Sequence, residues 1–84
     1  MSRRDRLLAL LEKLRANPKT VAFEDLDRAL TLSGFESRNN ASSHYVYRRP
    51  GCPLFTVPRH RPVKAVYVRK AIEHIERYGD LDED

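Results

Sequence analysis

Cysteine, tryptophan and long apolar runs are nearly or wholly missing from this chain of 84 residues. Cys52 is the only cysteine, so no disulfide can form within the chain. No stretch approaches the roughly 18 consecutive apolar residues that a membrane-spanning helix requires. We therefore expect a soluble cytoplasmic protein without a disulfide framework or a membrane segment.

Motifs for metal ions and for phosphate-cradling loops are missing as well. The three histidines, His44, His60 and His74, are separated by 16 and 14 residues and form no pair at helical spacing. The three glycines are isolated, and a turn or a helix end explains each of them. The sequence therefore predicts no metal site and no cofactor.

Acidic side chains are absent from Ser37 to Ile72, a segment that contains eight arginines and lysines. Four of the twelve acidic residues lie in the last five positions, so residues 1–79 carry 16 basic and 8 acidic side chains. The net charge of +4 thus understates how basic the remainder is. A segment of one sign indicates a nucleic-acid or acidic-protein partner, although a solvated basic face is the simpler alternative.

Apolar spacing predicts two helices in the first part of the chain. Leucines recur every three to four positions over Arg3–Ala16, and Asn17-Pro18 ends this helix because the residue before proline avoids the α region. A second helix is expected from about Phe23 to Ser33, with Gly34 beyond its end. The first helix either packs on a sheet or helps to form a partner interface.

After the second helix the apolar period changes to two. Alternation predicts strands at Phe35–Arg38, Tyr45–Arg48 and Leu54–Val57, joined as an antiparallel meander. Helical spacing returns from about Val63 and ends at Gly79. The predicted fold class is α+β in the order ααβββα, a three-stranded antiparallel sheet packed against helices. It forms one domain over residues 1–79, followed by an acidic, frayed tail over residues 80–84.

One constellation of residues carries a functional signal. The segment Ser42-Ser43-His44-Tyr45-Val46-Tyr47-Arg48 opens the second predicted strand, and Thr56-Val57-Pro58-Arg59-His60 closes the third. This order resembles the HicA family of toxin ribonucleases. In that family a Gly-Ser-His signature opens the second strand, an aromatic residue follows three places after the histidine, and a Val-Pro segment ends the third strand. The resemblance covers about Phe23 to Ile75.

The resemblance implies both a fold and an activity. The fold would be similar to a double-stranded-RNA-binding domain, with residues 1–16 as an additional N-terminal helix. The activity would be that of the toxin of a type II toxin–antitoxin system, an endoribonuclease that cleaves messenger RNA and is silenced by a HicB-like antitoxin protein. His44 takes the catalytic position and Ser43 matches the family's serine. Ser42 stands where glycine is usual, and a serine there reshapes a loop that glycine would leave open to a phosphate.

The chemistry of such an enzyme can be stated from the residues. A metal-independent ribonuclease needs a base for the 2′-hydroxyl, cations for the charge on phosphorus, and an acid for the leaving oxygen. An imidazole can take either proton role, which points to His44. Tyr47, a lysine and water are open candidates for the acid. The residues expected to contact RNA lie in or beside the second and third strands: Ser43, Tyr47, Arg48, Arg49, Arg59, His60, Arg61 and Lys64.

Each assignment has a structural alternative. His44 can instead be a strand residue that packs locally, and His60 either contacts phosphate or is a plain loop residue. We expect His74 on the surface of the last helix. Tyr45 and Tyr47 should share one sheet face, where they either stack on RNA bases or join the core. The alternative functions are a non-catalytic RNA-binding module on the same scaffold and a basic face that binds only protein.

Overall fold

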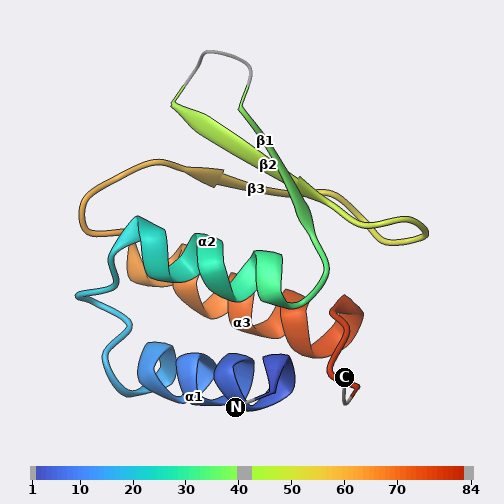
Figure 1. Ribbon diagram of the computed structural model, residues 1–84. Helices are drawn as coiled ribbons and strands as arrows, with labels where there is room; N and C mark the ends of the chain where they lie inside the picture. The colour runs from blue at the N-terminus through green and yellow to red at the C-terminus, as the bar shows by residue number, and fades with distance from the viewer. Residues whose placement is uncertain (1, 40–42, 83–84) are drawn as a thin grey trace.

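The computed structural model describes residues 2–39 and 43–82 as a layered α+β fold (Figure 1). Within these residues the elements follow the predicted order ααβββα, which confirms the fold class. They are α1 (Arg3–Ala16), α2 (Phe23–Leu32), β1 (Glu36–Asn39), β2 (His44–Arg48), β3 (Phe55–Pro58) and α3 (Ala65–Tyr78). In the described part of the chain, no helix has the length and apolarity needed to cross a membrane.

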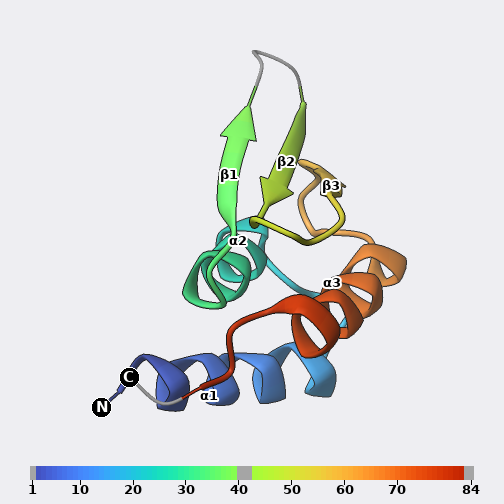
Figure 2. The same ribbon diagram turned by 90° about the vertical axis from the view of Figure 1, so that its right-hand side faces the viewer.

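The three strands form one antiparallel sheet in the order β1-β2-β3, with β2 in the centre. Tyr47 of β2 lies opposite Ser37 of β1 and Phe55 of β3. Helices α2 and α3 lie side by side beneath one face of this sheet, and α1 lies beneath both helices (Figures 1 and 2). Among the described elements, none covers the opposite face of the sheet.

The hydrophobic core fills the space between these layers. Each fully buried leucine or valine contributes about 1.5–3 kcal/mol relative to an exposed one. The core consists of Leu7, Leu11, Leu14, Val21, Phe23, Leu26, Ala29, Leu30, Phe35, Tyr47, Val57, Val63, Val68, Ala71, Ile72 and Ile75. Tyr47 and Val57 come from the sheet, so only its helix-facing side takes part in the core.

Helix α1 has the predicted bounds and packs on the other two helices. The Ser2 hydroxyl accepts a hydrogen bond from the Asp5 backbone N–H at 3.1 Å and caps the first turn. The helix ends at Ala16, directly before Asn17-Pro18. Its buried leucine face joins the core against α2 and α3, on the side away from the sheet. Of the two uses left open for this helix, packing on the sheet is therefore excluded.

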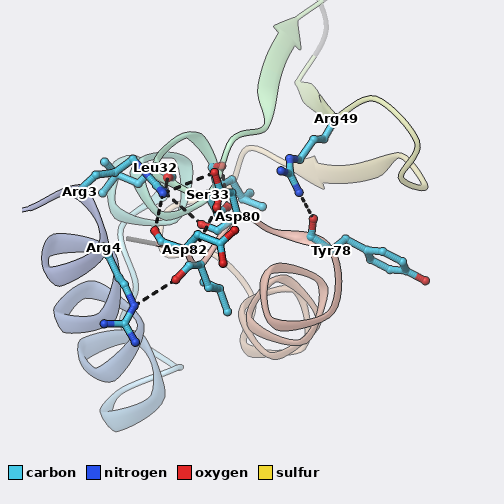
Figure 3. A network of polar contacts seen from close by, with 10 residues as sticks. Arg3, Arg4, Leu32, Ser33, Arg49, Tyr78, Asp80 and Asp82 are labelled. Atoms are coloured by element: carbon cyan, nitrogen blue, oxygen red, sulfur yellow. Dashed lines mark hydrogen bonds and ion pairs between the residues drawn. The ribbon is translucent and has the colours of Figure 1, made fainter. Parts of the chain in front are cut away.

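The segment that follows α3 is held against α1 and α2 (Figure 3). The Arg3 guanidinium donates to the carbonyl oxygens of Leu32 at 2.6 Å, Asp80 at 3.0 Å and Asp82 at 2.9 Å. It also forms an ion pair with the Asp80 carboxylate at 3.5 Å. One side chain from the start of the chain thus ties the end of α2 to the segment after α3.

Two further hydrogen bonds fix the same segment. The Arg4 Nε donates to the Leu81 carbonyl at 3.1 Å, and the Asp80 N–H donates to the Ser33 carbonyl at 2.8 Å. These bonds hold residues 80–82 against α1 and α2, in the segment where the sequence predicted a frayed tail. Residues 83 and 84 lie outside the described part of the chain.

His74 of α3 is half-buried among aromatic rings, so its predicted surface position is wrong. Its ring centroid lies 5.2 Å from that of Phe35, 5.0 Å from Phe55 and 4.9 Å from Tyr78. The ring donates a hydrogen bond to the backbone of Pro53, which offers only a carbonyl, while the buried Nε2 has no hydrogen-bond partner. Desolvation by burial lowers the pKa of His74.

We predict that His74 makes the fold less stable in acid. Because its pKa in the folded state is below the ordinary imidazole value of about 6.5, the unfolded chain binds a proton first as the pH falls. The contribution of His74 to stability is therefore complete above about pH 6.5 and decreases as the pH falls below it. Urea unfolding of the wild type and of His74→Phe at several pH values should show a flatter pH dependence for the variant. A variant curve parallel to that of the wild type would contradict this role, and the exposed His60→Ala serves as the control.

Candidate functional site

The face of the sheet that no described helix covers carries His44. Side chains alternate along a strand, so His44, Val46 and Arg48 of β2 point away from the helices, while Tyr45 and Tyr47 point toward them. Residues opposite one another in neighbouring strands share a face. We call this surface the outer sheet face; it consists of Glu36, Arg38, His44, Val46, Arg48, Thr56 and Pro58.

Two arginines join His44 on the outer sheet face. Arg38 lies opposite Val46, and Arg48 lies opposite Glu36, the acidic residue of this face. Arg38 and Arg48 are diagonal neighbours across β1 and β2, about 7–8 Å apart. Arg48 follows His44 by four positions, which is roughly 13 Å along the strand. His44, Arg38 and Arg48 are all exposed, so this face presents an imidazole and two guanidinium groups to solvent.

Arg59 lies at the same end of the sheet as His44 but borders the opposite face. Its backbone N–H donates to the Ser43 carbonyl at 2.6 Å, which extends the pairing of β2 and β3 by one residue. Its guanidinium carbon lies 5.5 Å from the ring centroid of Phe23 and 5.9 Å from that of Tyr45, within cation–π range. Its Nη1 donates to the Tyr45 hydroxyl at 3.3 Å. Arg59 is thus held in place while it remains exposed.

The segment between β3 and α3 adds the exposed His60 and Arg61 near this end of the sheet, and it ends at Lys64, the exposed residue directly before α3. The His60 N–H donates to the carbonyl of Pro58, the residue that pairs with His44. Arg61 forms an ion pair with Glu24 at 3.1 Å, so part of its charge is matched at the start of α2. The structure therefore gathers Ser43, His44, Arg59, His60 and Arg61 around one end of the β2–β3 pair.

Tyr47 belongs to the core, so the predicted contact between Tyr47 and RNA is wrong. It is 0 % exposed, and its hydroxyl donates to the Asp27 carboxylate at 2.6 Å. Burial, together with Asp27, raises the pKa of the Tyr47 hydroxyl well above its ordinary value. Tyr47 is therefore also removed from the candidates for the general acid. Tyr45 is half-buried and packs on Phe23, with ring centroids 4.8 Å apart.

Arg49 has a structural role in place of the expected phosphate contact. Its side chain turns toward the C-terminal end of α3, where Nη1 donates to the Tyr78 carbonyl at 2.6 Å (Figure 3). Carbonyls in the last turn of a helix have no hydrogen-bond partner within the helix. A cation at this end also interacts favourably with the negative end of the helix dipole. Arg49 thus stabilises the end of α3, while its neighbour Arg48 lies on the outer sheet face.

Comparison with protein-family models, with curated proteins and with solved structures finds no match to this chain. Within residues 2–39 and 43–82, no three His, Cys, Asp or Glu side chains converge as the ligands of a metal ion would. Ser42, which stands where the HicA signature has glycine, lies outside the described residues.

Arg38 is a cation of the outer sheet face that was not among the residues predicted to contact RNA. It was part of the basic segment, but it lies in β1, away from the motif around His44. The register places it opposite Val46, on the same face as His44. The alternation of Glu36, Ser37 and Arg38 was the signal that could have identified it, once the covered face of the sheet was known.

Proposed function

We propose that this protein is a HicA-like endoribonuclease that binds messenger RNA on the outer sheet face and cleaves it with His44. The observation that carries the proposal is the position of His44, exposed at the start of the central strand with Arg38 and Arg48 on the same face. A surface of this kind lets an RNA backbone approach an imidazole without displacing any described element. The proposed cell-biological role is that of a cytoplasmic toxin under the control of a HicB-like antitoxin.

The proposed reaction is a transesterification within the RNA. The ribose 2′-oxygen attacks the adjacent phosphorus while His44 accepts the 2′-hydroxyl proton. The bond from phosphorus to the 5′-oxygen breaks, and that oxygen takes a proton from a lysine or from water. The products are a 2′,3′-cyclic phosphate and a 5′-hydroxyl end. Arg38, Arg48 and Arg59 would neutralise phosphate charge and position the strand.

Burial of Tyr47 supports a second candidate, a non-catalytic RNA-binding module on the same scaffold. Because Tyr47 is enclosed in the core, one of the possible proton donors for the leaving oxygen is lost. Binding needs only the basic outer sheet face and the exposed groups near Arg59. The two candidates differ in turnover and share the RNA-binding surface.

The test is incubation of a defined messenger RNA with the purified protein in excess EDTA. We expect cleavage products that end in a 2′,3′-cyclic phosphate, because the proposed reaction needs no metal ion. RNA that stays intact but binds would contradict the nuclease and favour the binding module. In that case the logarithm of the binding constant should fall linearly with the logarithm of the salt concentration, with a slope of about −0.7 for each neutralised phosphate. Intact RNA without binding would contradict both.

A further inference from the structure

A surface groove runs between α1 and α2, on the part of the molecule away from the sheet. Its volume is about 580 Å³, and both helices line it. Figure 2 shows α1 below α2, with the sheet beyond α2. The α2 layer therefore lies between this groove and the outer sheet face, and a molecule bound in the groove leaves His44 accessible.

Three exposed cationic side chains form the rim of the groove. Arg6 and Lys13 come from α1 and Arg28 comes from α2, and all three are exposed. Lys13 forms an ion pair with Asp25 at 3.2 Å, so part of its charge is matched within the protein. None of the described residues that line the groove is acidic. The groove thus has a positive rim.

The floor of the groove is apolar. Leu10 of α1 and Leu32 of α2 line it, and each is half-buried against the edge of the core. An RNA backbone would meet the cations but would place its phosphates over these leucines, where they have no polar partner. A helix with one apolar and one acidic face satisfies both the floor and the rim.

The spacing between the cations of α1 indicates which kind of partner helix would fit the groove. Lys13 follows Arg6 by seven positions, or about 10.5 Å along the helix axis, with Leu10 between them. A helix that lies along the groove would match this spacing with carboxylates seven residues apart and leucines between them. We propose that the α1–α2 groove is a docking site for an acidic amphipathic helix of a partner protein.

The experiment uses the full chain and a synthetic helical peptide of about 20 residues, with glutamates at seven-residue spacing on either side of a leucine stripe. Calorimetric titration should show binding that weakens with salt. The charge-reversed variant Arg6→Glu/Arg28→Glu should bind at least about tenfold more weakly, because like charges then face the peptide. Arg69→Glu, an exposed substitution on α3, should bind as the wild type does.

Three outcomes would overturn the proposal. One is the absence of binding at peptide concentrations up to about 1 mM. Another is equal binding by a peptide in which lysines replace the glutamates, since that would remove charge complementarity as the cause. The third is loss of RNA affinity in the charge-reversed variant together with unchanged peptide affinity, which would assign the groove to RNA. Circular dichroism of each variant, with Arg28→Gln as a milder second substitution, verifies that folding is retained.

Discussion

Replacement of His44 by alanine is expected to lower the rate of RNA cleavage by about 10²–10⁴-fold, the usual contribution of a positioned general base. His44 is exposed at the first residue of β2, so its loss should change the free energy of unfolding by no more than about 0.5 kcal/mol. The measurement is the initial rate of cleavage of a defined messenger RNA in excess EDTA. Thermal unfolding followed by circular dichroism verifies that the variant is folded.

His60→Ala is the matched control for this substitution. His60 is also an exposed histidine. It lies two positions after Pro58, the residue that pairs with His44. If His44 is the base, His60→Ala should reduce the rate only slightly, by loss of a phosphate contact. A His44→Ala protein that cleaves as fast as the wild type, or a His60→Ala protein that is as inactive as His44→Ala, would contradict the assignment.

RNA affinity separates a catalytic role of His44 from a binding role. Arg38, Arg48 and Arg59 remain in the His44→Ala protein, so its affinity for RNA should stay close to that of the wild type. A loss confined to kcat indicates an interaction made only in the transition state. If affinity and rate fell together, His44 would be one more contact to RNA, as the binding-module alternative implies.

The elements of the fold were predictable because their signals are local. Asn17-Pro18 ends α1 where the sequence indicated, and alternation identified all three strands to within one or two residues. The start of α3 was less accurate: it begins at Ala65, since Val63 is buried in the core before the helix begins. The Val63 N–H donates to the Val21 carbonyl at 3.0 Å, a long-range bond that no local pattern reveals.

The candidate site was only partly predictable, because charge and alternation do not say which way a side chain turns. Arg48 and Arg49 are neighbours of equal charge, yet Arg48 lies on the outer sheet face and Arg49 binds the end of α3. Arg48 is the last residue of β2 and keeps the alternation of the strand, whereas Arg49 follows the strand and is free of that alternation. His74 was misjudged because the adjacent Glu73 suggested solvent, although the rings of Phe35, Phe55 and Tyr78 surround it.

Tyr47 also shows that a sequence pattern does not say which face of a sheet is buried. The sequence indicated that Tyr45 and Tyr47 share a face, and the structure confirms this. Which face the helices cover depends on tertiary packing and not on the pattern within the strand. The base-stacking alternative for Tyr47 was therefore open until the position of α2 was known.

The substitution with the largest expected effect on stability is Tyr47→Ala. Removing a fully buried aromatic side chain costs about 3–5 kcal/mol, which is a large part of the roughly 5–15 kcal/mol that holds a typical domain folded. Tyr47→Phe keeps the ring but removes the donor to Asp27, and hydrogen bonds to charged groups contribute about 1.5–3 kcal/mol. Urea unfolding curves give both values.

The RNA affinity of the Tyr47→Phe protein tests whether Tyr47 is a core residue or a platform on which RNA bases stack. A ring enclosed beneath the sheet cannot touch RNA, so Tyr47→Phe should lose stability and keep its RNA affinity. Tyr45→Phe is the control: the hydroxyl of this half-buried residue contacts the exposed Arg59, and its removal should cost little stability. Unchanged stability with weaker RNA binding in Tyr47→Phe would contradict the buried position, because only a hydroxyl that reaches the ligand can produce that result.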